Sequence, residues 1–458
     1  MNDLPMHAIS PVDGRYCSKT EPLSAYFSDF ALTKTRVETE CRYVIALDRF
    51  GLFKKLSSDE LASLANLTAG FCESDYYEIK RIEASVIHDV KACELFIRVR
   101  AGLSCPNMIH FGLTSEDVNN ISYALMVMRY RDGIQLETMK SLIEKLCDMA
   151  IKWRSVPFPA KTHGQAASPS TAGKELSVFA SRLANVYGGV KKCDIMAKLN
   201  GAVGNYSAMR SAFPDFDWIS FSDGFIKSLG FLPETATTQV GNRDWLIDYL
   251  DRVRHFNNVL LDMDVDMWQY VSFGFFKGSA PAGSVGSSTM PHKINPINFE
   301  NGEGNVAVAN ALLSMVSDRI GRSRMQRDLS DSTVMRNIGV ALAHSHMAVM
   351  ESASGLSKTS VDVEKCAFEI SRRPELIAEA VQTILRTCTD DDPYMIMKEM
   401  TMGKSVSIAE IMKFVDGLPI PDDKKLTIKN ISPVEYIGLA ETVCDRAVAS
   451  ARNIIGCK

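Results

Sequence analysis

The sequence predicts an all-α protein of three domains whose centre is a bundle of long helices. The first observation is the spacing of proline, which interrupts helices and is missing from 107–156, 170–213, 234–280 and 297–373. The second is that apolar residues in these stretches recur at steps of three and four, the period of a helix with one buried face. No stretch of comparable length alternates with the period of two that is typical of a half-buried strand.

The predicted elements follow this pattern along the chain. Residues 1–107, with closer prolines and shorter apolar runs, are expected to form an N-terminal helical domain. Residues 108–362 are expected to form the bundle, because apolar stripes run from Ile121 to Ala150 and from Leu246 to Val271. Such helices exceed the mean of about 11–12 residues and suggest a core shared between subunits. Residues 363–458 are expected to form a C-terminal helical domain.

Composition excludes several classes of protein. The 458 residues are 46% hydrophobic and 23% charged, which is typical of a globular protein, and the net charge of −4 disfavours binding to nucleic acid or an anionic membrane. The 11 cysteines form no C-x-x-C pair, and the sequence contains neither a signal peptide nor a membrane-spanning apolar run. We therefore expect a cytoplasmic protein without a disulfide framework.

The most unusual segment is the polar, glycine-rich stretch at 278–305, where a loop of this length is uncommon unless it is functional. It contains Ser287, Lys293 and Asn295. Glycine amides, the lysine and the asparagine suit binding of an oxyanion or carboxylate, and a serine hydroxyl suits proton transfer. We expect a mobile loop at about 283–298 that covers a site. The alternative is a flexible surface connection.

Histidine and arginine supply further candidates. His163 lies in the polar segment THGQ, His110 in HFGLTSEDVNN, and His88 stands before Asp89, all settings that suit acid–base work near neutral pH. Each histidine taken alone is more often structural. The segment QRDLSDSTVMRN carries two arginines around Ser332 that suit a phosphate or carboxylate, although arginines on a helix surface are the simpler interpretation. No H-E-x-x-H spacing occurs, so no catalytic metal site is expected.

These motifs together resemble the fumarase/aspartase superfamily. The stretch GSSTMPHKINP at 286–296 is similar to its signature loop, and SPVDGRY at 10–16, HFGLTSEDVNN at 110–120, THGQ at 162–165 and QRDLSDSTVMRN at 326–337 extend the resemblance through most of the chain. The PHK form of the loop favours the branch that acts on succinylated purine nucleotides, whereas argininosuccinate lyases resemble PQK and fumarases PGK there. The resemblance implies a three-domain, mostly helical homotetramer with active sites shared between subunits.

The implied reaction is elimination of fumarate in purine synthesis, from adenylosuccinate to give AMP and from succinylaminoimidazole carboxamide ribotide to give the carboxamide (AICAR), without a cofactor. The resemblance makes Ser287 the general base and His163 the general acid. It implies that the substrate is bound by Arg15, Tyr16, His88, Asp89, His110, Thr114, Ser115, Gln239, Lys293, Asn295, Arg327, Ser332 and Arg336. The implied ligands are small nucleotides, with no nucleic acid and no membrane.

Two positions depart from the family pattern. Ile87 stands where a polar residue is frequent, and Ala166 follows THGQ where proline is common. The alternatives to this function are another lyase of the superfamily, such as argininosuccinate lyase or aspartase, and a non-catalytic structural relative. The presence of Ser287, His163 and Lys293 argues against a non-catalytic relative.

Overall fold

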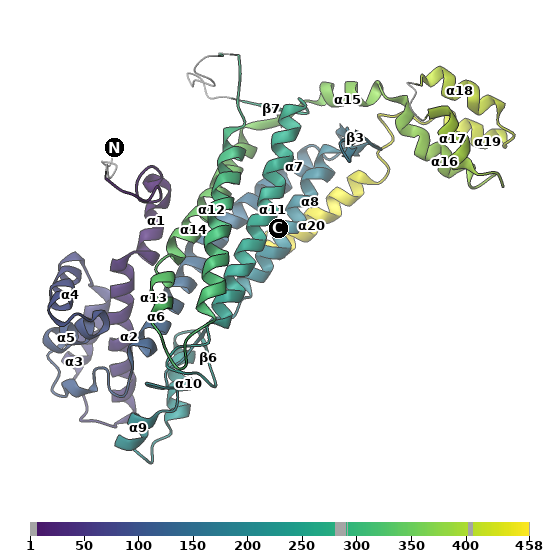
Figure 1. The fold of residues 1–458 in the computed structure, drawn as a ribbon. Helices are drawn as coiled ribbons and strands as arrows, with labels where there is room; N and C mark the ends of the chain where they lie inside the picture. Colours follow the sequence, from purple (N-terminus) through teal and green to yellow (C-terminus); the bar gives the residue numbers. More distant parts are fainter. Residues whose placement is uncertain (1–6, 280–289, 291, 402–405, 458) are drawn as a thin grey trace. The chain divides into compact units, whose positions relative to one another are not determined.

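The computed structural model describes residues 7–279, 290, 292–401 and 406–457, and helices dominate it (Figure 1). The chain divides into two compact units, each made of three segments. The first unit contains Met1–Thr138, Gly189–Asn257 and Gly304–Ala348, and the second contains Met139–Gly188, Asn258–Glu303 and Val349–Lys458. The all-α class predicted from the sequence is confirmed. The three domains at 1–107, 108–362 and 363–458 stay a prediction.

The N-terminal segment of the first unit begins with five helices. They are α1 (Cys17–Phe27), α2 (Asp29–Phe50), α3 (Ser58–Ala69), α4 (Glu73–Val86) and α5 (Asp89–Ala101). Local signals set their ends: the Ser28 hydroxyl accepts a hydrogen bond from the Ala31 amide at the start of α2, and Gly51, at φ 67°, ends that helix. Helices α2 to α5 bury apolar faces against α6 and α10 in one core, which includes Val44, Phe96 and Ile121.

The middle of the chain contains the two longest helices described, α11 and α12, together with several shorter ones. In chain order, the helices of this region are α6 (Ser115–Tyr130), α7 (Leu136–Lys152), α8 (Ala172–Lys191), α9 (Ser207–Ala212), α10 (Trp218–Ser228), α11 (Asp244–Ser272), α12 (Ile297–Ile320), α13 (Ser330–Met335) and α14 (Ile338–Ser357). A single π-helical turn, Arg131–Gln135, joins α6 to α7. Both apolar stripes predicted from the sequence therefore lie on helices, and the stripe of α11 is buried from Leu246 to Met267.

In each unit, α11, α12 and α14 pack together. Within the first unit, Leu250, Leu313 and Leu342 from these three helices share one buried core. Within the second unit, the Ser352 hydroxyl of α14 donates to Asp264 of α11 at 2.7 Å. Figure 1 shows the three helices running side by side. The predicted long-helix bundle is thus present.

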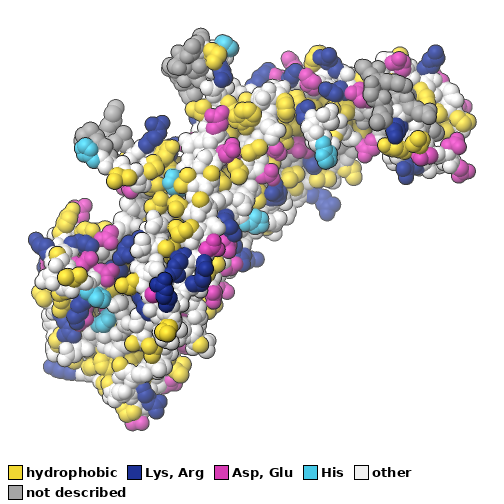
Figure 2. Space-filling model, in the orientation of Figure 1, with side chains coloured by type: hydrophobic (Ala, Val, Ile, Leu, Met, Phe, Trp, Pro, Cys, Tyr) yellow, Lys and Arg dark blue, Asp and Glu magenta, His cyan; other side chains and the backbone are white. Residues whose placement is uncertain are grey.

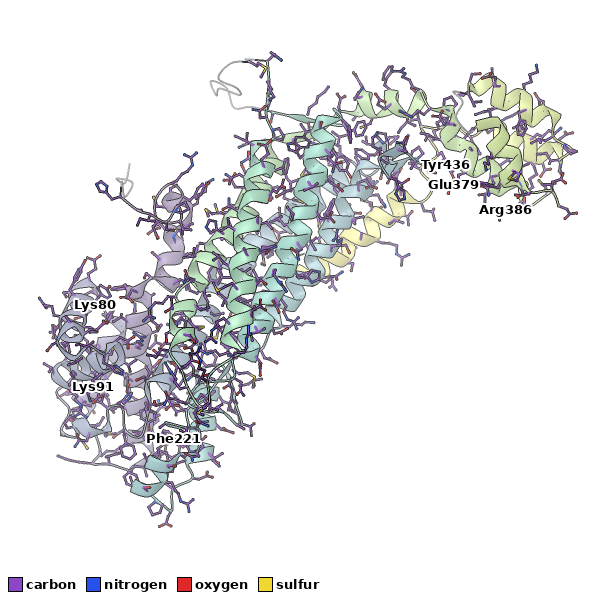
Figure 3. The ribbon with its side chains drawn as sticks, in the orientation of Figure 1. Lys80, Lys91, Phe221, Glu379, Arg386 and Tyr436 are labelled. Carbon is purple, nitrogen blue, oxygen red and sulfur yellow. The ribbon has the colours of Figure 1, made fainter. Side chains whose placement is uncertain are left out.

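The C-terminal part of the second unit consists of shorter helices. They are α15 (Val363–Ser371), α16 (Ala378–Leu385), α17 (Pro393–Thr401), α18 (Ile408–Gly417), α19 (Asp422–Lys429) and α20 (Ala440–Ile455). Helices α16 to α19 enclose a small apolar core that includes Val381 and Ile411. The Tyr436 hydroxyl donates to Glu379 of α16 at 3.3 Å, which ties the chain before α20 to this group (Figure 3).

Strands in the described residues are two or three residues long and form four pairs. The antiparallel pairs are β1 (Pro157–Phe158) with β4 (Ser170–Thr171), β2 (Lys161–Thr162) with β3 (Gln165–Ala166), and β7 (Phe276–Gly278) with β8 (Thr359–Val361); β5 (Met196–Ala197) and β6 (Leu232–Pro233) are parallel. They fix connections between helices and form no layer of their own.

Candidate active site

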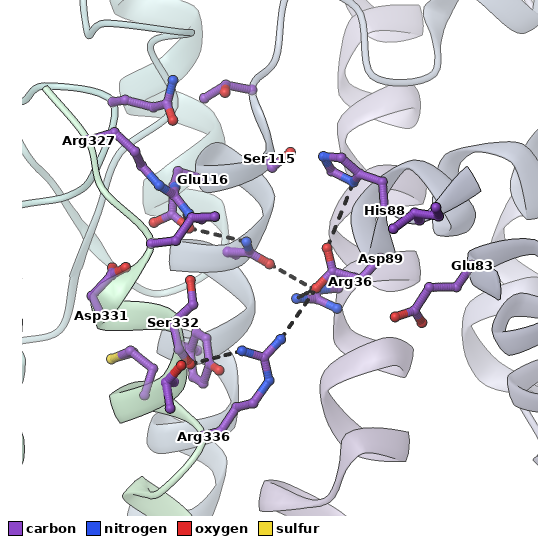
Figure 4. Close-up of a pocket in the computed structure, with 18 of the residues that line it drawn as sticks. Arg36, Glu83, His88, Asp89, Ser115, Glu116, Arg327, Asp331, Ser332 and Arg336 are labelled. Carbon is purple, nitrogen blue, oxygen red and sulfur yellow. Dashed lines mark hydrogen bonds and ion pairs between the residues drawn. The ribbon is translucent and has the colours of Figure 1, made fainter. Parts of the chain in front are cut away.

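A cavity of about 880 Å³ opens in the first unit (Figure 4). Its walls come from α2, α4, the starts of α5 and α6, the chain before α11, and the segment that leads into α13. Eight of the residues that the sequence nominated for substrate binding line it: His88, Asp89, Thr114, Ser115, Gln239, Arg327, Ser332 and Arg336. The structure therefore gathers in one place side chains that lie up to 248 positions apart in the chain.

Helix starts place four of these side chains. His88 is the N-cap of α5, its Nδ1 accepting a hydrogen bond from the Lys91 amide at 3.2 Å, and Asp89 opens the helix. Thr114 and Ser115 begin α6, where the Thr114 amide donates to Asp117 at 2.9 Å. Helix N-termini favour negative charge, so both ends suit an anionic ligand.

Asp89 is held by arginine. The Arg36 guanidinium lies 2.7 Å from the Asp89 carboxylate, and Arg336 lies 3.7 Å from it (Figure 4). Burial alone raises the pKa of Asp89, but Arg36, the Val90 amide and His88 together bring this pKa below its ordinary value. The carboxylate is therefore ionised at neutral pH and fixed in direction.

A second charged group lies around Glu116, whose side chain is 3% exposed. Its carboxylate accepts from Arg327 at 2.9 Å, from Arg243 at 2.9 Å and from the Asn119 amide at 3.1 Å. Arg243 also reaches Asp331 at 2.8 Å. Because arginine and carboxylate alternate in this group, each buried charge has an opposite neighbour, which burial requires.

Arg336 is the most exposed arginine of the cavity, with 53% of its side chain accessible. Its Nη1 donates to the Ser332 carbonyl at 3.0 Å, which places the fork beside α13 (Figure 4). Accessible guanidinium forks bind phosphate or carboxylate groups through paired hydrogen bonds. The cavity thus suits a ligand that carries several anionic groups.

Three nominated residues of the first unit do not line this cavity. Arg15 is exposed, and Tyr16 forms the N-cap of α1. The His110 ring lies 2.5 Å from the buried Glu40 carboxylate, which also accepts from the His110 amide at 3.1 Å. Burial lowers the pKa of His110, but Glu40 raises it further, and the net shift is upward. His110 is therefore engaged by this buried carboxylate rather than turned toward the cavity.

The other nominated residues belong to the second unit. His163 lies in the tight turn between β2 and β3 with φ 51° and is exposed. Ala166, the departure from the family pattern, pairs with Lys161 in this hairpin. Asn295 lines a small hollow, and Lys293 is exposed. Ser287 lies outside the described residues, as do residues 283–286, 288, 289 and 291 of the predicted mobile loop at 283–298.

Seven charged or amide side chains of the cavity were not nominated from the sequence: Arg36, Lys80, Glu83, Glu116, Asn119, Arg243 and Asp331. Three of them stand inside motifs that were singled out, HFGLTSEDVNN and QRDLSDSTVMRN. Arg36 and Arg243 stand in stretches without any special pattern. Their partners in the structure are the only signal that identifies them.

Comparison with known proteins agrees with this fold. Residues 14–310 match the family described as "Lyase", and residues 323–437 match "Adenylosuccinate lyase C-terminal". Crystal structures with the same fold include a 3-carboxy-cis,cis-muconate lactonizing enzyme from Pseudomonas putida (TM-score 0.75, 17% identity, 95% of this chain and 97% of that one) and a fumarate lyase from Mesorhizobium sp. BNC1 (0.76, 15%, 94% and 97%). The fold and the lyase match define an enzyme of the fumarase/aspartase superfamily of lyases.

Comparison with sequence relatives identifies the family within this superfamily. The chain is 40% identical to the adenylosuccinate lyase of Escherichia coli K12 over 446 residues (96% of this chain, 98% of the relative) and to that of Haemophilus influenzae over 447 (96% and 98%). The identity to the adenylosuccinate lyase of Dictyostelium discoideum is also 40%, over 449 residues (94% and 96%). The chain belongs to the adenylosuccinate lyase family. Among the described residues, no helix is both long and apolar enough to cross a membrane.

Proposed function

We propose that this enzyme eliminates fumarate from adenylosuccinate, giving AMP, and from succinylaminoimidazole carboxamide ribotide, giving the carboxamide, in purine nucleotide biosynthesis. The observation that carries the proposal is the 40% identity to adenylosuccinate lyases over nearly the whole length of both chains. The cavity supports it, because its accessible arginine and two helix N-termini suit a substrate with one phosphate and two carboxylates.

The reaction breaks two bonds of the succinyl group. A base removes a proton from the carbon beside one carboxylate, the bond from the neighbouring carbon to nitrogen then breaks, and an acid protonates the departing nitrogen. We assign the base to Ser287 and the acid to His163. Negative charge grows on the carboxylate beside the deprotonated carbon, and Lys293 and Asn295 are assigned to stabilise it.

Substrate binding is assigned to the residues of the first unit. Arg327, Ser332, Arg336, Thr114 and Ser115 supply donors for the phosphate and succinyl oxygens. His88, Asp89 and Gln239 orient the remainder of the nucleotide, and the sequence motifs assign His110, Arg15 and Tyr16 to the same substrate. None of these steps uses a cofactor.

We further propose a cytoplasmic homotetramer whose active sites combine residues of different subunits. Helices α11, α12 and α14 expose large apolar side chains, including Trp268, Val308, Met315 and Met350, and Figure 2 shows hydrophobic side chains spread along the bundle. Exposed apolar surface of this kind favours association with further chains.

A substrate panel tests the activity. Purified protein is given adenylosuccinate, the succinylated imidazole ribotide, argininosuccinate, or fumarate with ammonia, and fumarate is followed. The proposal expects fumarate from the first two only. Cleavage of argininosuccinate, or loss of fumarate with ammonia, identifies a different lyase, and no reaction with any substrate identifies a non-catalytic relative.

Mixing inactive variants tests the shared site. His163→Ala and Ser287→Ala chains are mixed in equal amounts under conditions that exchange subunits. If a site takes these two residues from different chains, about one quarter of the sites is intact and activity returns to about 25% of wild type. Activity that stays at background after verified exchange contradicts the shared site.

A further inference from the structure

Arg243 occupies an unusual place directly before α11. The residue is 6% exposed and its φ is 62°, in the left-handed region that residues other than glycine rarely adopt. A conformation of this kind persists only where the surrounding contacts hold it, and it is frequent at functional sites. The contacts of this side chain therefore need an explanation.

The Arg243 guanidinium joins two carboxylates of the first unit. Its Nη2 donates to Glu116 Oε2 at 2.9 Å and to Asp331 Oδ2 at 2.8 Å, and the three side chains are only 7%, 3% and 8% exposed. Within the described part of the chain, Asp331 Oδ1 is buried and has no hydrogen-bond partner. Arg243 is thus the charge partner of Asp331, while Glu116 also binds Arg327.

Both carboxylates belong to elements that carry proposed binding residues. Glu116 follows Thr114 and Ser115 at the start of α6, and its other arginine is Arg327. Asp331 is the second residue of α13 and directly precedes Ser332, with which it is drawn in Figure 4. Arg243 therefore connects α6 to α13, beside the direct ion pair between Glu116 and Arg327.

We propose that Arg243 is a positioning residue for anion binding: by joining Glu116 to Asp331 it holds Arg327 and α13 in the arrangement that receives the anionic groups of the substrate. Arg243 borders the cavity, but Nη2 is engaged by two carboxylates, so its effect on the ligand passes mainly through the neighbouring residues. The inference rests on the proposed function for the identity of the substrate.

Charge explains why the arrangement depends on this residue. Without Arg243, the buried Asp331 loses its guanidinium partner, and Glu116 retains Arg327. The two carboxylates then repel each other and both attract Arg327, which shifts it away from a bound anion. The cavity also becomes more negative by one charge, which disfavours an anionic ligand directly.

The variant Arg243→Gln tests the proposal by steady-state kinetics with adenylosuccinate. We expect KM to rise about tenfold, because a weakened charge-assisted hydrogen bond to the substrate has an effect of this size, while kcat changes less than about threefold. The double variant Arg243→Gln/Asp331→Asn also removes the uncompensated carboxylate, so its KM is expected to return most of the way to the wild-type value. Arg252→Gln on α11, whose partner Asp248 is 52% exposed, is the matched control and keeps the wild-type KM.

A purely structural role predicts a different result. It lowers the amount of folded enzyme and hence the apparent kcat, and it leaves the KM of the folded fraction unchanged. Arg243→Lys keeps the charge without the planar fork, and about a threefold rise in KM is expected even if Arg243→Gln does not fold. Wild-type KM in Arg243→Lys, or no recovery of KM in a folded double variant, overturns the proposal.

A second measurement separates this inference from the proposed function. Inorganic phosphate is titrated into wild type and Arg243→Lys, and its dissociation constant is measured by ³¹P NMR. Weaker phosphate binding in the variant supports the positioning role whether or not the wild type releases fumarate from adenylosuccinate. Equal phosphate binding contradicts that role, whereas absence of fumarate with the wild type contradicts only the proposed function.

Discussion

Replacing Lys198 by methionine removes one member of a fully buried ion pair. Lys198 Nζ lies 3.0 Å from Asp117 Oδ1, and both side chains are 0% exposed. Asp117 also accepts from the amides of Thr114 at 2.9 Å, Asn200 at 3.0 Å and Gly201 at 3.1 Å. Burial lowers the pKa of Lys198 and the Asp117 carboxylate opposes this, so the pair depends on both members.

The environment of the ion pair sets the expected loss of stability. Removing one partner of a buried pair costs about 3–5 kcal/mol, because the other charge stays buried without compensation. Methionine preserves most of the apolar packing of the lysine, and the three amides still solvate Asp117. We therefore expect the lower end, about 3 kcal/mol, which is a factor of about 10² in the folding constant.

Urea unfolding followed by circular dichroism at one fixed protein concentration measures the change. Lys227→Met is the matched control, since Lys227 and Asp223 on α10 lie 3.9 Å apart with 61% and 40% of their side chains exposed, and its effect should stay below about 0.5 kcal/mol. Wild-type stability in Lys198→Met refutes the reasoning.

Four further substitutions test other parts of the structure. Glu40 raises the folded-state pKa of His110 above its ordinary value. The stability that this pair supplies is therefore complete below about pH 6.5 and is lost as the pH rises through the raised pKa. His110→Gln should abolish that part of the pH dependence of the unfolding free energy, and an unchanged pH profile contradicts the prediction. Ile87 has φ 54° and is 90% exposed, so Ile87→Gly should stabilise the protein by about 1 kcal/mol in thermal unfolding, whereas a lower midpoint shows that the backbone is not strained. A Cβ added at Gly302 would meet a buried carboxylate oxygen at 2.3 Å, whereas a Cβ added at Gly224 would have no atom within 4 Å. Gly302→Ala should therefore destabilise the protein by about 1–3 kcal/mol, and Gly224→Ala should stabilise it by about 0.5–1 kcal/mol. Equal effects of the two substitutions on the free energy of unfolding contradict this packing.

The sequence predicted the helices well because their signal is local. The apolar stripe from Leu246 to Val271 repeats at the helical period without a proline, and this is the span of α11. The eight nominated residues that line the cavity came from the family resemblance, which rests on short motifs. His88 and Asp89, or Thr114 and Ser115, are neighbours within short polar motifs at helix starts, so one motif supplies several of them.

Ion pairs between residues far apart in the chain could not be predicted from the sequence. Arg243 lies 127 positions from Glu116 and 88 from Asp331, and no periodicity connects residues so far apart. The partner of His110 shows the same limit, because Glu40, whose carboxylate contacts the His110 ring, lies 70 positions away in the chain. The tertiary fold decides which charged residues meet, and local sequence patterns carry no signal for it.

Release of fumarate and AMP from adenylosuccinate by the purified protein tests the central claim most directly. Both products are quantified by chromatography at several times, for the wild type and for Ser287→Ala. We expect equal amounts of fumarate and AMP from the wild type, and a kcat lower by several powers of ten in Ser287→Ala, since a general base acts in the transition state. Adenylosuccinate that stays intact with folded wild-type protein contradicts the claim.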